Sequence, residues 1–214
     1  KITYIEQSSP KGLPDAFILG EQFIGKDKVA LILGDNFFYG QSLTKKLKDC
    51  IKLNSGCKIL LHPVSKPELY GVANINSKKK IVSIKEKPKK TNSNLAITGL
   101  YFFDNKVINY SKYLKPSKRN ELEMIDLLNN YKRNNKLKAE FLGRGGAWLD
   151  TGSINDFYNT SAFVSALENR QGFKIACLEE IAFKSKWINK KDIKKAISFY
   201  GNCIYSNYLK KIIQ

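Results

Sequence analysis

Two aspartates occupy matching places in the sequence. Asp35 follows the apolar run 29–33 and one glycine, and Asp150 closes the run 147–150 shortly before Gly152. The first run predicts a strand buried on both faces. Ligands of open α/β sheets bind beyond the carboxyl ends of strands, so two carboxylates at neighbouring strand ends can share one Mg2+ and clamp a phosphate. Taken alone, Asp35 fits equally well as a cap of the turn after its strand.

A second polar set lies in the middle of the chain. Glu86 and Lys87 precede a proline at the end of a predicted strand. A carboxylate accepts hydrogen bonds from sugar hydroxyls, and an ammonium binds phosphate as a point charge. A solvated hairpin edge explains the same pair without a ligand. Tyr70 and Gly71 on the facing strand either stack on a ring or fill the core.

Two further positions have special backbone or hydrogen-bonding chemistry. An amide supplies both a donor and an acceptor, so Gln7 with Gly12 suits the edge of a nucleobase, although the same residues can also stitch a turn. Gly99 interrupts the predicted strand 94–103, which marks a place where another group approaches the backbone closely.

Hydrophobic periodicity and turn residues set out the elements that must position these groups. Strands are predicted at 2–6, 29–33, 57–64, 70–75, 81–86, 94–103 and 136–142, and helices at 14–24, 42–51, 104–108, 121–130, 153–172 and 181–213. Residues 34–40 are predicted to be a loop, and 70–75 with 81–86 a hairpin. Ile154, Phe157, Val164 and Leu167 are predicted to face inward on the long helix.

The alternation of strands and helices predicts an α/β fold with a mixed, mostly parallel, Rossmann-like sheet. We expect residues 1–152 to form this sheet domain. Residues 153–214 are expected to form a helical region that packs on it or on a neighbouring subunit.

Composition limits the kinds of partner that the chain is expected to bind. The chain has 214 residues, 43% of them hydrophobic, and a formal net charge of +18. Such a charge suits nucleic-acid or membrane binding, but the lysines are scattered in short runs and no nucleic-acid recognition motif is present, so we expect neither partner. The charge would still favour an anionic substrate.

Cysteine spacing and the chain start point to a cytoplasmic location. The four cysteines lack paired C-x-x-C spacing, and the chain has a single histidine as a possible further zinc ligand. This argues against a zinc site and favours reduced thiols. No stretch has the length and apolarity of a membrane span, and the first residues lack a signal-peptide layout.

Nine stretches in collinear order together resemble the glucose-1-phosphate thymidylyltransferases, a family of sugar nucleotidyltransferases. They are Q-S-S-P-K-G-L at 7–13, L-G-D-N-F at 33–37 with Y-G at 39–40, Y-G-V at 70–72, E-K-P at 86–88, I-T-G-L-Y-F at 97–102, E-L-E at 121–123, A-W-L-D-T-G at 147–152, E at 168 with R-Q-G at 170–172, and E-E-I-A-F at 179–183.

The resemblance implies roles for the matching residues. Gln7 and Gly12 would bind the thymine edge, with Asp35 also in the nucleotide site, and Asp35 and Asp150 would hold the catalytic Mg2+. Lys87 would join the two aspartates in catalysis. Arg144 is implied at a regulatory nucleotide site of a homotetramer. The glucose-1-phosphate site would be lined by Asn36, Tyr70, Gly71, Glu86, Lys87, Thr98, Gly99 and Trp148.

The implied reaction joins dTTP and glucose-1-phosphate into dTDP-glucose and pyrophosphate, for rhamnose-type polysaccharide synthesis. The alternatives are a UTP-dependent or other sugar-phosphate relative, and a non-catalytic sugar-nucleotide-binding relative. Three departures stand out. The family's Gly-rich loop G-G-x-G-T-R-L is absent, which predicts an amino-terminally truncated chain without its phosphate cradle; Ile125 replaces a usual threonine, and Gly146 a frequent aromatic residue.

Overall fold

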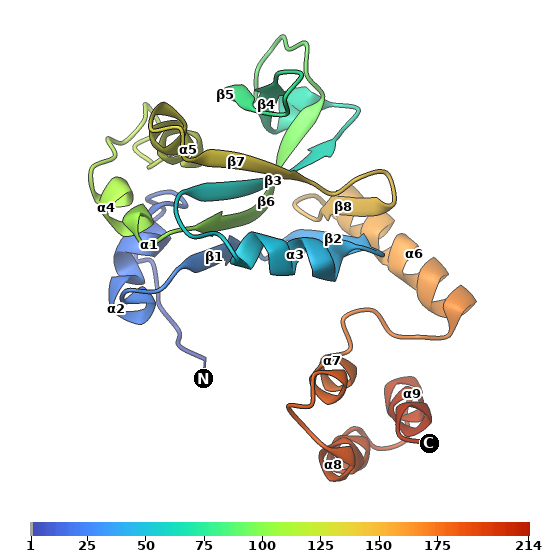
Figure 1. Ribbon diagram of the computed structural model, residues 1–214. Helices are drawn as coiled ribbons and strands as arrows, with labels where there is room; N and C mark the ends of the chain where they lie inside the picture. The colour runs from blue at the N-terminus through green and yellow to red at the C-terminus, as the bar shows by residue number, and fades with distance from the viewer. Residues whose placement is uncertain (1) are drawn as a thin grey trace. The chain divides into compact units, whose positions relative to one another are not determined.

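The computed structural model describes residues 2–214 and divides into two compact units, Lys1–Thr151 and Gly152–Gln214 (Figure 1). The strands of the first unit are β1 (Val29–Ile32), β2 (Asn36–Gly40), β3 (Cys57–Pro63), β4 (Gly71–Ile75), β5 (Ile81–Glu86), β6 (Leu95–Phe103), β7 (Leu137–Phe141) and β8 (Gly146–Asp150). Its helices are α1 (Asp15–Leu19), α2 (Glu21–Ile24), α3 (Leu43–Ile51), α4 (Lys106–Lys112) and α5 (Met124–Arg133), with a 3-10 turn at Pro67–Leu69.

The larger sheet has the order β5-β4-β6-β3-β7, and β1 pairs with β6 as well. The mixed α/β class is therefore confirmed, but the expected excess of parallel pairing is wrong. Among the described strands β3–β7 is the parallel pair, and the other pairings are antiparallel. The reason is β6. Strands β1, β3 and β7 run in one direction, but β6, which follows the β4–β5 hairpin, enters between β1 and β3 in the opposite direction.

Strands β3 and β6 form the centre of the unit because both of their faces are covered. Side chains alternate along a strand, so Ile59 and Leu61 enter one core while Leu60 enters the other. On β6, Tyr101 and Phe103 likewise join the first core, and Phe102 the second. The first core includes residues of α1, α4 and α5, which lie close together at one side of the sheet in Figure 1.

Strand β1 corrects one expectation. It was predicted to be buried on both faces, but its residues alternate between half-buried and exposed, and Ile32 is 56% exposed. It pairs only with β6 among the strands of residues 2–214, and Val29 and Leu31 pack on the first core while Ala30 and Ile32 are exposed. An apolar run of this length therefore does not distinguish a central strand from a strand covered on one side.

Three local predictions were also wrong. Residues 2–6 form no strand and lie exposed, because no described strand pairs with them. The helix predicted at 14–24 is split at Gly20 into α1 and α2. The loop predicted at 34–40 contains strand β2, whose partner β8 lies more than a hundred residues later, so no local turn signal announced it.

A buried carboxylate ties strands to helices in the same unit. Asp104 Oδ2 accepts from Gly56 N at 2.5 Å, while Oδ1 accepts from the Tyr131 hydroxyl at 2.8 Å and from Lys106 N at 3.2 Å. Asp104 thus joins the residue before β3, the start of α4 and the last turn of α5.

The second unit consists of α6 (Ile154–Gln171), α7 (Leu178–Lys184), α8 (Lys190–Tyr200) and α9 (Ile204–Ile212). Ser153 caps α6 by accepting from Asp156 N, and Gly172 ends it in the left-handed conformation, so these predicted bounds are confirmed. Buried Cys177, Ile193 and Leu209 form the core of the last three helices. Trp187 is 77% exposed.

The inward face expected for α6 is wrong at its start. Ile154 is 92% exposed and Phe157 63% exposed, because the core around Cys177 does not extend to the first turns of α6. Within residues 2–214 no helix combines the length and apolarity that a membrane crossing needs.

Candidate functional site

The two aspartates predicted from the sequence lie at adjoining strand ends. Asp35 follows β1, where Leu33 N donates to Gly99 O at 2.9 Å, and the chain turns directly into β2. Strand β2 pairs with β8 so that Asn36 lies opposite Asp150. Thr151 closes this end by donating from its backbone N and its Oγ1 to Asp35 O, both at 2.8 Å. The pairing of β2 with β8 therefore places Asp35 and Asp150 at the same end of this two-stranded sheet.

This donor set fits a hard divalent cation. Asp35 and Asp150 supply carboxylate oxygens, the ligand type that Mg2+ prefers, and Asp150 lies in β8 opposite Asn36, the residue that follows Asp35. The described residues contain no cluster of three or more His, Cys, Asp or Glu that could hold a metal. A cation here would complete its shell with water or substrate phosphate, as Mg2+ commonly does.

Asn36 links the aspartates to the central sheet. Its Oδ1 accepts from Gly99 N at 3.0 Å and from Trp148 Nε1 at 2.6 Å, and its Nδ2 donates to Asp35 Oδ1 at 2.7 Å. A Cβ placed on Gly99 would lie 2.6–2.8 Å from three atoms of the Asn36 side chain. The close approach predicted at Gly99 is thus confirmed, and the approaching group is Asn36. Asp35 acts as an acceptor for Asn36, beyond any role as a turn cap.

A cavity of about 290 Å3 is lined by four of the eight residues predicted to bind a sugar phosphate, namely Tyr70, Gly71, Glu86 and Lys87. Asp150, predicted as a metal ligand, lines it as well. Gly71 lies opposite Glu86 in the β4–β5 hairpin, and a Cβ on Gly71 would lie 3.2 Å from Glu86 Oε2. The missing side chain therefore leaves room beside the Glu86 carboxylate.

Burial perturbs the acids of this cavity. Partial burial raises the pKa of Glu86, and the nearby Lys87 ammonium opposes that rise. Tyr101 also lines the cavity and is 6% exposed; its burial, followed by the charge of Glu86, raises its pKa. The cavity thus offers a carboxylate acceptor, a cation and a phenol that stays protonated.

The other four residues predicted for the sugar phosphate, Asn36, Thr98, Gly99 and Trp148, do not line this cavity in the structure, and neither does Asp35. Thr98 is fully buried and its hydroxyl donates to Leu60 O at 3.2 Å. Trp148 is 8% exposed and packs edge-on against Tyr70, with ring centroids 5.0 Å apart, while its indole N–H binds Asn36. Trp148 therefore supports the cavity wall through Tyr70, whereas Thr98 ties β6 to β3.

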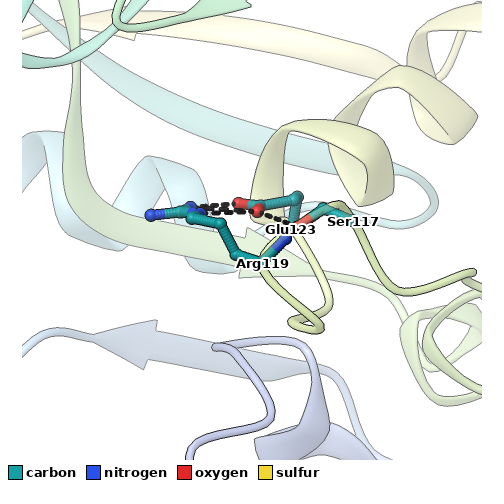
Figure 2. Close-up of polar contacts among 3 residues, drawn as sticks. All are labelled: Ser117, Arg119 and Glu123. Carbon is teal, nitrogen blue, oxygen red and sulfur yellow. Dashed lines mark hydrogen bonds and ion pairs between the residues drawn. The ribbon is translucent and has the colours of Figure 1, made fainter.

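Arg119 and Glu123 were missed by the sequence reasoning. Both line the cavity, and Figure 2 shows them joined with Ser117. Arg119 lies before α5 and Glu123 is its N-cap residue. Both belong to a charged segment whose composition is typical of a solvated turn. Their spacing of four residues, typical of an ion pair on a helix, was the available signal.

Gln7 and Gly12 line a second, more apolar cavity of about 580 Å3. Gln7 Nε2 donates to Asp15 Oδ2 at 2.7 Å and to Gly12 O at 3.4 Å. Gly12 has φ +91°, and a Cβ on it would lie 2.1 Å from Leu122 O, so only glycine fits there. Gly12, Leu13 and Glu121 line both cavities, which makes the two neighbours.

Comparison with known proteins decides the family. The nucleotidyl transferase model matches residues 1–166. A glucose-1-phosphate thymidylyltransferase of Neisseria meningitidis is 43% identical over 213 residues, which are 100% of this chain and 74% of that relative. The chain belongs to the nucleotidyl transferase family. A glucose-1-phosphate thymidylyltransferase of Mycobacterium tuberculosis is 38% identical, again over 100% of this chain and 74% of the relative.

Solved structures agree with this nucleotidyl transferase fold. A Bacillus anthracis protein crystallised with sucrose, provisionally named a glucose-1-phosphate thymidylyltransferase, matches with a TM-score of 0.68 and 38% identity. A UDP-glucose pyrophosphorylase in complex with UDP-glucose matches with a TM-score of 0.66 and 26% identity. Each match covers 75% of this chain and 64% of the solved chain.

Arg144 lies apart from both cavities of this nucleotidyl transferase. It is exposed in the turn between β7 and β8, next to Gly143 with φ +80°, and lines neither cavity. Its regulatory role stays a prediction.

Proposed function

We propose that this nucleotidyl transferase uses dTTP and glucose-1-phosphate to form dTDP-glucose and pyrophosphate. One observation carries the proposal: Glu86, Lys87, Arg119 and Asp150 line the same cavity. Such a lining offers an acceptor for sugar hydroxyls, two cations for a phosphate and one ligand for a metal. The curated relatives named as glucose-1-phosphate thymidylyltransferases supply the substrate pair.

The neighbouring cavities suit two substrates. The smaller, charged cavity would hold glucose-1-phosphate, and the larger cavity with Gln7 and Gly12 would hold the nucleobase. The residues they share would lie beside the point where the substrates meet. Gln7 donates to Asp15 from its amide nitrogen, so its amide oxygen would accept from the imide N–H of a thymine or uracil.

The chemistry needs no protein nucleophile. A phosphate oxygen of glucose-1-phosphate attacks the α-phosphorus of dTTP, the bond from that phosphorus to the bridging oxygen breaks, and pyrophosphate leaves with the electron pair. Lys87 and Arg119 would hold the attacking phosphate, Glu86 would orient the sugar, and Asn36 would fix Asp35. Alignment and charge neutralisation then lower the barrier.

Asp35 and Asp150 would hold Mg2+, since their carboxylates at adjoining strand ends match its ligand preference. The bound cation would neutralise charge on the phosphate oxygens. We also propose a homo-oligomer, tetrameric by the family resemblance, and light scattering of the purified protein measures this directly.

Calorimetric titration with glucose-1-phosphate tests the sugar-phosphate site. We expect binding to the wild type, and at least tenfold weaker binding to Lys87→Ala, because a charge-assisted hydrogen bond is lost. Lys85→Ala is the matched control, since Lys85 lies two residues earlier, on strand β5, and lines no described cavity. A wild type that shows no binding at millimolar ligand, or a Lys87→Ala variant that binds equally well, refutes the assignment.

A pyrophosphate-release assay over a panel of nucleotides tests the substrate pair. The proposal expects dTTP to be used fastest. Preference for UTP would instead support the function of the UDP-glucose pyrophosphorylase that shares the fold. Sugar-phosphate binding without release under any nucleotide would indicate a non-catalytic relative.

A further inference from the structure

The segment between α4 and α5 forms a hydrogen-bonded loop that carries Arg119 between Lys118 and Asn120. Ser117 N donates to Glu121 O at 2.8 Å, and Asn120 N donates to Ser117 O at 2.9 Å. Asn120 has φ +60°, and Arg119 N donates to Ser117 Oγ at 3.2 Å. Leu122 N ties the loop to Lys11 O at 2.8 Å. The backbone around Arg119 is therefore fixed on both sides.

Glu123 holds the guanidinium along one edge. Its Oε1 accepts from Arg119 Nε at 3.2 Å and Nη2 at 2.9 Å, and its Oε2 accepts from Nη2 at 2.8 Å (Figure 2). The Ser117 hydroxyl donates to the same Oε1 at 2.7 Å. The Glu123 side chain is 20% exposed and that of Arg119 60% exposed. A long, exposed side chain is thus held by a more buried carboxylate.

Glu123 stays anionic in this arrangement. Its partial burial alone would raise its pKa, but the hydrogen bonds from Ser117 and Arg119 outweigh burial and lower it. The carboxylate engages the Nε and Nη2 side of the guanidinium. The two N–H groups of Nη1 have no hydrogen-bond partner among the described residues and remain to donate to a ligand anion.

The ion pair of Arg119 and Glu123 lies close to a second cation, Lys87. Arg119 and Lys87 both line the 290 Å3 cavity, and both line an adjoining hollow together with Ser117 and Glu123. Two cations that converge on one space bind a phosphate best when their directions are already set, because the ordering cost then falls on folding rather than on binding.

We propose that Glu123, supported by Ser117, is a positioning residue that holds Arg119 so that its Nη1 edge and the Lys87 ammonium grip the phosphate of the sugar phosphate from two sides. The inference rests on the proposed function. A purely Coulombic view gives the opposite expectation, because a carboxylate beside Arg119 cancels its charge and should weaken anion binding. The two views therefore predict changes of opposite sign.

Titrations with glucose-1-phosphate and with uncharged glucose separate these views. We expect Glu123→Ala to bind glucose-1-phosphate about five- to tenfold more weakly, the cost of immobilising one long side chain on binding. Glucose binding should not change. Glu123→Gln keeps an acceptor oxygen and should recover part of the loss. In an Arg119→Ala background, Glu123→Ala should have no further effect.

Glu180→Ala is the control for loss of a comparable carboxylate. Glu180 is 17% exposed, is paired with Lys184 four residues away and also accepts from the Tyr208 hydroxyl. It lies in the second unit, and its removal should leave both affinities unchanged. Circular dichroism of each variant shows whether the fold is retained.

Three results overturn the inference: unchanged or tighter glucose-1-phosphate binding by Glu123→Ala, equal weakening toward glucose, or an effect of Glu123→Ala that persists without Arg119. A wild type that binds no glucose-1-phosphate refutes the proposed function instead. Failure of the positioning role alone is thus distinguishable from failure of the site assignment.

Discussion

Replacing Gly99 with alanine tests whether the contact with Asn36 organises the site. The added Cβ would lie 2.6 Å from Oδ1, 2.7 Å from Cγ and 2.8 Å from Nδ2 of Asn36. These distances are too short to coexist, so the Asn36 side chain must leave. Its departure removes the acceptor of two N–H groups, one on the backbone at residue 99 and one on Trp148.

The magnitude follows from those two donors. A buried donor left without its acceptor costs about 1–3 kcal/mol, so Gly99→Ala should lower the free energy of unfolding by about 2–6 kcal/mol. Asn36→Ala removes the same acceptor and should cost a similar amount. The double variant should cost no more than Asn36→Ala, because the three atoms nearest to the new methyl group are then gone.

Urea unfolding of the four proteins measures this cycle. We expect a coupling of about 2 kcal/mol or more between positions 36 and 99, as for residues in direct contact. Gly34→Ala is the control, since a Cβ there meets no atom within 4 Å and Gly34 does not have a positive φ. Equal costs of Gly99→Ala in the wild-type and Asn36→Ala backgrounds would refute the reasoning.

Three further predictions concern other parts of the first unit. Gly12→Ala should lower the melting temperature more than Gly143→Ala: both residues have positive φ, but only the Gly12 methyl would meet a backbone oxygen, and equal shifts would contradict this. Burial raises the pKa of Glu86, so the stability that its protonated form contributes is complete at low pH and is lost as the pH rises through the raised pKa. The melting temperature of Glu86→Gln should therefore be higher than that of the wild type at pH ~7, and the two should be equal below pH ~4. Asp104→Ala leaves three donors without their acceptor and should lower the free energy of unfolding in urea by about 3–5 kcal/mol. The same change at the exposed Asp27 should lower it by less than about 0.5 kcal/mol.

Elements with local signals were predictable from the sequence. Ser153 and Gly172 mark the ends of α6 through capping and left-handed geometry, and both act as expected. The hairpin of β4 and β5 follows from two strand-like runs around an Asn-Ser-Lys turn. Gly99 signalled a close backbone approach because a glycine inside a strand has few other uses.

Features that depend on distant pairing were not predictable. Strand β2 exists because β8 pairs with it, and no residue near 36–40 encodes that partner. The insertion of β6 between β1 and β3 likewise depends on segments far apart in the sequence. Thr98 and Gly99 were both expected to line one site, but neighbouring residues of a strand point to opposite faces, and Thr98 is buried against Leu60.

The two tryptophans give the protein an optical signal for each unit. Trp148 is 8% exposed and hydrogen-bonded to Asn36 beside the aspartates, whereas Trp187 is 77% exposed in the second unit. An indole in an apolar setting emits at shorter wavelength than one in water. The blue side of the emission spectrum should therefore follow events around Asp35, and the red side should follow the helical unit, without any added label.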